Sequence, residues 1–293
     1  MLKADFFCGI DEILKENEQL AAFLYEDYSV QNHSHEFYEM NIIMSGRGQH
    51  VIEGHAFSVR RGDVFIISPG LIHCYEKTEK LNVFHILFRP SFLREYASEQ
   101  EKAEGFSLLT EIEPYLRSSY SQPLFLHLSA SCLMGLQSDF EIITRDSQFD
   151  APQYRPLQNH TALKLLYYCS ALLARQTYGE KAPSSENEQA VMRVLEYIHA
   201  NYAQKITLQK LCEISYMTRS TLLRHFAALC GCSPSDYLIR FRIRQASHLL
   251  EQTDRKKTDI AVSCGFYDLS HFERAIAAST GRKDKESASW TDI

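Results

Sequence analysis

The residues of this chain that are best suited to chemistry lie in one segment near its beginning. Two histidines and a glutamate follow the spacing His-x-His-x-x-x-Glu, and another histidine follows a glycine, an aspartate and a proline. These four residues are His33, His35, Glu39 and His73. Imidazole nitrogens and carboxylate oxygens can bind Fe, Mn, Ni or Zn. The same groups form hydrogen bonds readily, so the pattern leaves open both a metal site and a pocket for a small polar molecule.

A pattern that occurs twice in the last third of the chain supplies a second set of candidates. The corresponding residues, fifty positions apart, are Leu222 and Phe272, Arg224 and Arg274, Phe226 and Ile276, and Gly231 and Gly281. Such a repeat indicates one supersecondary unit used twice. Each unit is predicted to be a short helix, a tight turn and a second helix that ends at glycine, which is a helix-turn-helix.

The outward face of each second helix is predicted to read DNA. Arg can form two hydrogen bonds to guanine in the major groove, Ser and His can bond base edges, and Leu can contact a thymine methyl. The predicted base-contacting residues are Ser220, Leu223, Arg224, Leu269, Ser270, His271 and Arg274. A solvated helix face is the alternative for each residue, but arginines at matched positions of a repeat favour DNA contact.

Basic residues between the two units are assigned to DNA phosphates, which supply affinity and salt dependence but no sequence reading. They are Arg242, Arg244, Arg255, Lys256 and Lys257. Side-chain caps predict helices that begin after Thr207, Thr218, Ser233, Thr258 and Asp268. The helix over 234 to 251 would span about 27 Å and could hold the two reading helices about one DNA turn apart.

Charge is distributed unevenly along the chain. The whole chain carries a net charge of -6, which excludes a uniformly basic nucleic-acid coat protein. Fifteen Lys and Arg against twelve Asp and Glu give the part from Glu188 onward a net charge of +3, which leaves -9 for the rest. This asymmetry is expected if only the last part touches nucleic acid.

The elements that must position these residues divide the chain into parts. Short alternating segments over 30 to 90, punctuated by glycines, predict an antiparallel sandwich or barrel. Residues 106 to 178 are predicted to add helices. We expect domain 1–178, linker 179–186, DNA-binding domain 187–286 and tail 287–293. One apolar stripe could pair two helices in a dimer or pack on its own sheet. It comprises Leu126, Ala130, Leu133, Leu136, Phe140 and Ile143.

No export or membrane segment is visible, and the eight cysteines form no CxxC pair. The expectation is a cytoplasmic, nucleoid-associated protein with reduced thiols. The sequence also lacks GxGxxG, GxxxxGK[ST], GxSxG and HExxH, so no enzyme activity and no cofactor are expected.

The repeat region resembles the DNA-binding domain of the AraC/XylS family of transcription regulators over about ninety residues. The densest matches are Gly231-x-Ser233-Pro234-x-x-Tyr237-Leu238, Arg242-x-x-x-Ala246-x-x-Leu249-Leu250 and Ile260-Ala261 with Cys264-Gly265-Phe266. The resemblance implies seven helices, two adjacent major grooves and base contacts by the residues named above. After Gly281 this chain departs from the family pattern, and Ile276 replaces a usual Phe, which puts the second unit in question.

The first segment resembles the two cupin motifs and also the sensor domains of the AraC/XylS family. In a cupin barrel the four candidate ligands would face inward. The residues assigned to an effector pocket are His35, Tyr38, Glu39, Arg47 and His73. By resemblance the effector is a small molecule such as a sugar. His50, His55 and His85 are expected to be structural or exposed.

These observations predict an α+β protein with a cupin-like β-barrel, a helical extension and an all-α domain with two helix-turn-helix units. The predicted function is a ligand-responsive transcription regulator that binds promoter DNA as a homodimer and contacts RNA polymerase. Two alternatives stay open. One is a cupin metalloenzyme, a dioxygenase or isomerase, with an accessory DNA-binding domain, and the other is a DNA-binding protein whose β domain only oligomerises.

Overall fold

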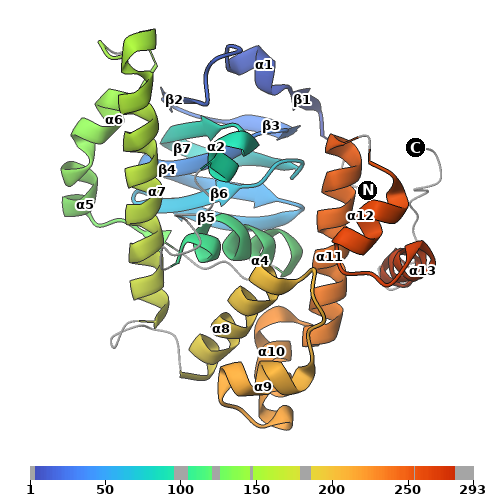
Figure 1. The fold of residues 1–293 in the computed structure, drawn as a ribbon. Coiled ribbons are helices and arrows are strands. Elements are labelled where there is room, and N and C mark those ends of the chain that lie inside the picture. Colours follow the sequence, from blue (N-terminus) through green and yellow to red (C-terminus); the bar gives the residue numbers. More distant parts are fainter. Residues whose placement is uncertain are drawn as a thin grey trace. The chain divides into compact units, whose positions relative to one another are not determined.

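The computed structural model describes residues 4–95, 105–120, 126–145, 148–178, 186–253 and 255–280 (Figure 1). The chain divides into two compact units. Leu2–Pro183 form the sheet unit and Ser184–Ile293 the helical unit. Most of the expected linker, 179–186, lies outside the described residues, as do 281–286 and the tail 287–293.

The sheet unit is built around one antiparallel ribbon of two long strands. Their register runs from the pair Tyr38 and Phe88 to the pair Ile52 and His73. The strands among the described residues are β1 (Phe6–Cys8), β2 (Leu20–Tyr25), β3 (Val30–His35), β4 (Tyr38–Ile52), β5 (His55–Arg60), β6 (Asp63–Ile67), β7 (His73–Phe88) and β8 (Leu126–His127). The central ribbon consists of β4 and β7, and their alternating apolar residues bury one face of each strand.

The ribbon folds back on itself near its middle. Glu39 pairs with Leu87 at one end, whereas His73 pairs with Ile52 at the other. In a flat ribbon these ends would lie about 40 Å apart at the usual rise per residue, yet the side chains of Glu39 and His73 approach to 3.3 Å. The bend coincides with register shifts between Ile43 and Gln49. It includes Gly46, where φ is +76° and any Cβ would lie 2.1 Å from the carbonyl oxygen of Lys80.

The two halves of the ribbon enclose a buried interior. On one edge β7 pairs with β3 along its first half and with β2 along its second. On the other edge β4 pairs with β6 and then β5. An apolar cluster that includes Ile43, Phe65 and Val83 fills much of the interior. The remainder is lined by polar side chains.

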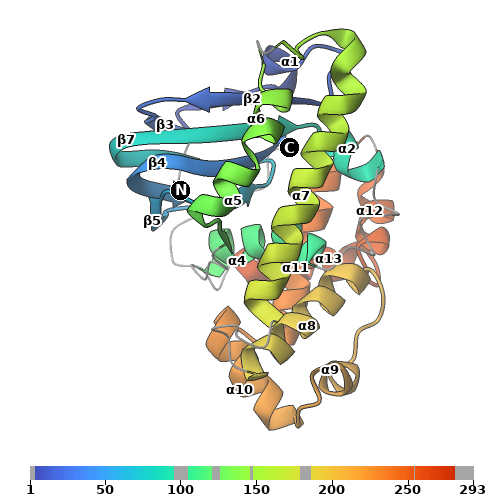
Figure 2. The ribbon, with the colours of Figure 1, turned by 90° about the vertical axis from the view of Figure 1, so that its left-hand side faces the viewer.

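Helices cover the outside of the sheet, and α7 runs along one side of it in both views (Figure 1 and Figure 2). Phe140 packs on Phe84 with ring centroids 4.8 Å apart. The helical segments of this unit are α1 (Ile10–Ile13), α2 (Pro90–Glu95), the π-helical η1 (Leu108–Ile112), α4 (Glu113–Tyr120), α5 (Ala130–Gly135), α6 (Gln137–Ile143), the 3-10 turn η2 (Pro152–Tyr154) and α7 (Arg155–Tyr178).

The predicted helical stripe belongs to three different elements, β8, α5 and α6. Leu126, Leu133, Leu136, Phe140 and Ile143 are all buried in the sheet unit, and Ala130 is exposed. Most of this stripe is therefore buried within the sheet unit and does not form an exposed seam. Phe140 packs on the sheet, and α6 also packs against α7.

The helical unit carries two helix-turn-helix units joined by a long helix. Its helices among the described residues are α8 (Glu186–Asn201), α9 (Leu208–Ser215), α10 (Arg219–Cys230), α11 (Pro234–Gln252), α12 (Lys257–Ser263) and α13 (Leu269–Thr280). The pairs α9 with α10 and α12 with α13 are the two units. Their second helices start fifty residues apart and each has 12 residues, as the repeat predicts.

Most of the predicted caps are confirmed. Thr207, Thr218 and Ser233 each accept a hydrogen bond from the backbone N–H three residues later, and Asp268 does the same for α13. Thr258 is wrong as a cap, because α12 begins one residue earlier, at Lys257. No helix among the described residues is both long enough and apolar enough to cross a membrane.

Candidate functional site

A cluster of polar side chains lines the interior of the sheet unit. It contains His33 and His35 from β3, Glu39 and Asn41 from β4, and His73 and His85 from β7; His50, also from β4, lies next to them. Alternation along each strand turns these residues toward the same interior. All of them are buried, so the fold has placed a carboxylate and several imidazoles out of water.

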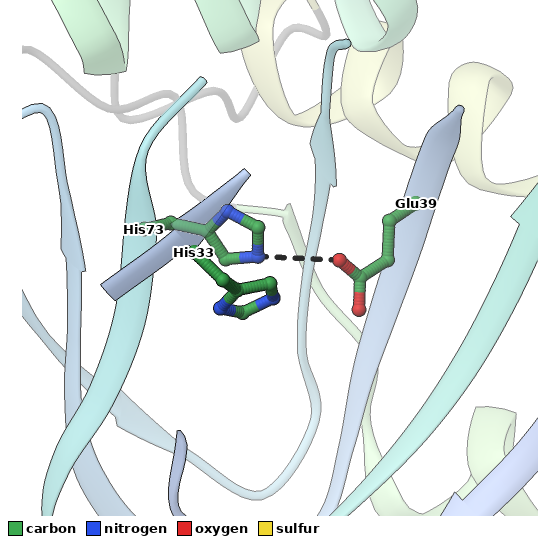
Figure 3. A group of neighbouring side chains, drawn as sticks. All are labelled: His33, Glu39 and His73. Atoms are coloured by element: carbon green, nitrogen blue, oxygen red, sulfur yellow. Dashed lines mark ion pairs between the residues drawn. The ribbon is translucent and has the colours of Figure 1, made fainter. Parts of the chain in front are cut away.

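Glu39 is the centre of this interior cluster. Its Oε2 atom lies 3.0 Å from Nε2 of His35 and 3.3 Å from Nε2 of His73. Its Oε1 atom accepts a short hydrogen bond from Nδ1 of His85. Figure 3 shows Glu39 facing His73 across the interior, with His33 beside His73. The imidazole rings of His33 and His73 have centroids 4.1 Å apart.

Three of the histidines are fixed in orientation by backbone carbonyls. Nδ1 of His33 lies 3.0 Å from the carbonyl oxygen of Gln31, and Nδ1 of His73 lies 3.2 Å from that of Leu71. Nδ1 of His35 lies 2.8 Å from the carbonyl oxygen of Phe37. A carbonyl oxygen can only accept, so Nδ1 carries the proton in each ring. Nε2 of His35 and of His73 then faces Oε2 of Glu39.

Burial sets the charge states in the cluster. It lowers the pKa of His33 to about 4, and it lowers the pKa of His35 and of His50 as well. Burial alone would raise the pKa of Glu39, but its close contacts with His85, His35 and His73 hold it well below the usual value. The carboxylate of Glu39 therefore stays ionised although it is buried.

Several polar atoms in this interior have no hydrogen-bond partner among the described residues. They are both side-chain atoms of the Asn41 amide, both ring nitrogens of His50, and Nε2 of His85. Each buried polar group without a partner costs about 1–3 kcal/mol. Buried polar atoms in native proteins normally find a partner, so these atoms mark a place for a polar ligand, an ion or ordered water.

The structure separates the five residues that the sequence assigned to an effector pocket. His35, Glu39 and His73 meet in the interior cluster. Tyr38 and Arg47 do not, and their assignment is corrected. Tyr38 is adjacent to Glu39 on β4 and so faces the opposite side, where it stacks on Phe88. Arg47 is exposed, pairs with Glu79 at 2.6 Å, and lines an open surface hollow beyond the bend.

Sequence reasoning missed three members of the cluster. His85 and His50, expected to be structural or exposed, are buried in the interior, where His85 holds Glu39. The third member, Asn41, was not among the residues predicted for the pocket. Its parity on the strand was a usable signal, because Asn41 is two residues from Glu39 and lies across from His85 in the sheet register.

The second candidate site is the outer face of α10 and α13. Leu222, Phe226 and Phe272 are buried in the cores of their units. The opposite faces carry Arg224 and Arg274, both exposed at equivalent positions of the two helices. Ser220 and Ser270 are exposed near the helix starts, and Leu223 is partly exposed.

Two predicted base contacts in the second unit have other partners within the protein. Leu269 packs against the apolar cluster of that unit and is only partly exposed. The ring of His271 accepts from the backbone N–H of Tyr267 and contacts Phe266 edge-on. Both side chains help to hold the turn before α13, which the outward placement predicted from the sequence did not include.

The structure corrects the prediction that Arg242 binds a DNA phosphate. It is only 9% exposed. Its Nε donates to the carbonyl oxygen of Tyr202 and its Nη2 to that of Gln204, both at 2.7 Å. Burial lowers the pKa of this arginine. Arg242 therefore ties α11 to the segment after α8. Arg255, Lys256 and Lys257 are exposed, and Arg244 is partly exposed.

Comparisons with known proteins match both units. The family profile described as "AraC-like ligand binding domain" matches residues 20–185, and the one described as "Helix-turn-helix domain" matches 211–283. The HTH-type transcriptional activator RhaR of Shigella dysenteriae is 26% identical over 282 residues, which cover 96% of this chain and 93% of that protein. RhaR of Escherichia coli K12 is 25% identical over the same coverage.

Two solved structures also align with this chain. ToxT from Vibrio cholerae is 14% identical to this chain. The alignment covers 89% of this chain and 94% of ToxT, with a TM-score of 0.34. The DNA-binding domain of AdpA, solved in complex with a target DNA, is 29% identical. That alignment covers 33% of this chain and 93% of that chain, with a TM-score of 0.26.

Proposed function

The chain belongs to the AraC family of transcription regulators, and from that premise we propose where its effector and its DNA bind. The interior cluster of the sheet unit binds the effector. The outer faces of α10 and α13 bind two adjacent major grooves of promoter DNA. Binding of the effector changes the DNA-bound state of the protein, since a ligand acts only by preferring one of two states.

The observation that carries the effector site is the buried carboxylate of Glu39. It lies among imidazoles, and several polar atoms around it have no partner. Such a set is costly unless something polar completes it. A sugar hydroxyl, an organic acid or an ion could do so. Every one of these ligands would have to reach Glu39, His35 and His73.

The DNA side of the proposal rests on the matched arginines. Arg224 and Arg274 are exposed at equivalent positions on two equivalent helices. An arginine presented by a helix can form two hydrogen bonds to guanine in the major groove. Ser220, Leu223 and Ser270 complete the proposed reading faces. Lys256 and Lys257 bind phosphate.

Further partners follow from the family and are part of the proposal. We propose that the protein acts as a homodimer in the cytoplasm, at promoter DNA, and that the bound protein contacts RNA polymerase. The curated relatives are named transcriptional activators, which supports the polymerase contact. Light scattering of the purified chain tests the dimer. A mass that stays at the 33.8 kDa of one chain would contradict it.

Selection of bound duplexes from a random pool tests the DNA-reading faces. We expect a motif with two halves about 10 bp apart, the spacing of successive major-groove faces. Arg224→Ala should lose base preference in one half and Arg274→Ala in the other. Arg193→Ala is the matched control, since it removes one exposed arginine from α8, outside both reading faces. An unchanged motif in both reading-face variants would contradict the proposal.

Effector binding is tested by the DNA affinity of the full chain with and without a panel of sugars and organic acids. The expected result is that one compound changes the affinity of the wild type and that Glu39→Gln abolishes the change. Glu79→Gln is the control, because Glu79 lies on the same strand pair but is exposed. An effect that survives Glu39→Gln would place the effector elsewhere.

A further inference from the structure

We propose that Tyr216 and Tyr267, one in the turn of each helix-turn-helix unit, bind DNA phosphates and so fix the depth and register at which α10 and α13 enter the major groove. This inference rests on the proposed function, since it adds contacts to the same DNA-binding surface. Neither residue was among those predicted from the sequence. A phosphate contact carries no base preference of its own, so both tyrosines position the helices that read the bases.

The two tyrosines have the most exposed large apolar side chains in the described part of the chain. Tyr216 is 90% exposed and Tyr267 is 88% exposed, and the next value, that of Met134, is 69%. Such exposure leaves almost all of a phenol ring in water, which is unfavourable for its apolar surface. A single exposed apolar residue is ordinary. Two rings of the same type, one in the turn of each repeated unit, indicate a common use outside the fold.

Tyr216 occupies a backbone conformation that the second unit gives to glycine. Its φ is +55°, in the left-handed region that residues with a Cβ avoid. The N–H of Tyr216 donates to the carbonyl oxygen of Glu213, and the N–H of the next residue donates to that of Cys212. The same pair of bonds, three and five residues back, closes α12 at Gly265, where φ is +85°. The two positions are therefore equivalent, and only the first has a side chain.

Packing explains the glycine of the second unit but not the tyrosine of the first. A Cβ at Gly265 would lie 2.8 Å from the carbonyl oxygen of Tyr202 and 2.9 Å from that of Ala203, so a side chain would collide with the backbone. The second unit instead exposes its tyrosine two residues later, at Tyr267. A glycine in place of Tyr216 would relieve the backbone strain. The tyrosine gains no packing at its exposure, so the strain is retained for a partner outside the unit.

The backbone of each tyrosine is fixed, although its ring is free. The N–H of Tyr267 donates to Nδ1 of His271 at 3.3 Å, and Asp268 caps the helix that follows. Thr218 caps α10 directly after the turn that contains Tyr216. Each ring is therefore presented from a fixed point at the start of a reading helix. Only the two side-chain torsions of each tyrosine have to be ordered on binding, which keeps the entropic cost low.

The place of the turns selects the phosphate backbone as the partner. In a helix-turn-helix the second helix contacts base edges with its N-terminal residues, while the first helix crosses the DNA backbone. The turn between them therefore lies where the chain passes the phosphates. Tyr216 comes three residues before Arg219, the first residue of α10, and Tyr267 comes two residues before Leu269, the first of α13. A phenolic O–H donates well to a phosphate oxygen.

The test is DNA binding by the full-length protein, measured by fluorescence anisotropy on the selected duplex and on variants of it with single mismatches. Tyr216→Phe and Tyr267→Phe each remove one hydroxyl. Each should weaken binding to every duplex about 10-fold, as expected when a hydrogen bond to a charged group is lost. The slope of log K against log salt should not change, because a neutral phenol displaces no counterion. Tyr154→Phe, in η2 of the sheet unit, is the control and should bind like the wild type.

Tyr216→Gly separates DNA binding from folding. This variant keeps the left-handed turn and removes the ring, so the denaturant midpoint should be no lower than that of the wild type. DNA affinity should fall about 10-fold or more. A lowered midpoint together with wild-type DNA affinity would mean that the ring serves the fold, and it would overturn the proposal for this residue.

The remaining outcomes separate this inference from the proposed function. Wild-type DNA affinity in both Phe variants would overturn it, and so would a loss of affinity confined to one base pair. A loss of transcription activation with unchanged DNA affinity would assign the rings to a protein partner and would also overturn it. If Arg224→Ala and Arg274→Ala lose base preference while both Phe variants bind normally, only the phosphate contacts fail. If none of these variants changes DNA binding, the proposed reading faces fail as well.

Discussion

The two units of this protein use charged side chains in opposite ways. In the sheet unit Glu39 is 4% exposed and surrounded by histidines. In the helical unit Arg224 and Arg274 are exposed on helix surfaces. A buried carboxylate has to be matched by partners within the fold, whereas an exposed arginine stays hydrated until DNA arrives. The proposed effector site is therefore formed by packing, whereas the proposed DNA-reading faces depend on which side of α10 and α13 each arginine lies.

Arg242 breaks this contrast, because it is a buried charge in the helical unit. It donates to the carbonyls of Tyr202 and Gln204. Gly265 lies beside the Arg242 guanidinium, because a Cβ added to Gly265 would lie 2.9 Å from the guanidinium carbon. This arginine joins α11 to the segment after α8 and lies beside the turn of the second unit. It resembles Glu39 more than it resembles Arg224.

The largest expected effect is the removal of this buried charge. Arg242→Ala should lower the free energy of unfolding by about 3 kcal/mol, because two backbone carbonyls lose charge-assisted hydrogen bonds from a buried guanidinium. Denaturant unfolding measures the loss. Lys257→Ala, which removes an exposed charge, should change stability little. If Arg242→Ala were as stable as the wild type but bound DNA poorly, Arg242 would instead contact a DNA phosphate, as predicted from the sequence.

A loss of similar size is expected when the buried charge of the sheet unit is removed. Contacts with His85, His35 and His73 hold the pKa of Glu39 well below its usual value, so the ionised carboxylate stabilises the folded state. Glu39→Gln should therefore lower the free energy of unfolding by about 3 kcal/mol, as measured by denaturant unfolding. Wild-type stability in this variant would mean that the carboxylate contributes nothing until a ligand is bound.

Smaller effects are expected from the exposed arginines. Arg224→Ala and Arg274→Ala should each reduce discrimination at one base pair by about 2 kcal/mol and leave stability unchanged. Competition between matched and mismatched duplexes measures the discrimination. An equal loss on every sequence would mean that these residues bind phosphate.

The smallest effects belong to the lysines before α12. Lys256→Ala or Lys257→Ala should weaken binding to all sequences alike and reduce the slope of log K against log salt by about one. Binding titrations at several salt concentrations measure the slope. A sequence-dependent loss would mean that base reading extends beyond the two helices.

The helical unit was largely predictable because its signals are local. Thr218 and Ser233 cap the helices that follow them, and Gly231 ends α10 with a φ of +67°. These contacts join residues only a few positions apart, so the local sequence is enough to predict them. Arg242 was not predictable in this way, because its partners lie about 40 residues away.

The interior cluster was predictable only in part. The spacing of His33, His35, Glu39 and His73 identified the types of side chain. Tyr38 and Arg47 were misplaced, because the face of a strand residue depends on its parity and on the bend at Gly46. His85 was passed over although it holds Glu39 across 46 positions of sequence.

The sequence by itself determined most of the helix starts, the buried face of α10, and the inventory of histidines near one glutamate. These depend on neighbours within one or two turns of chain. The tertiary structure alone decided that the ribbon of β4 and β7 doubles back. This bend brings Oε2 of Glu39, near one end, to 3.3 Å from Nε2 of His73, at the other. It also decided which charges are buried. Burial and long-range pairing are properties of the packed chain, and no spacing within a single segment encodes them.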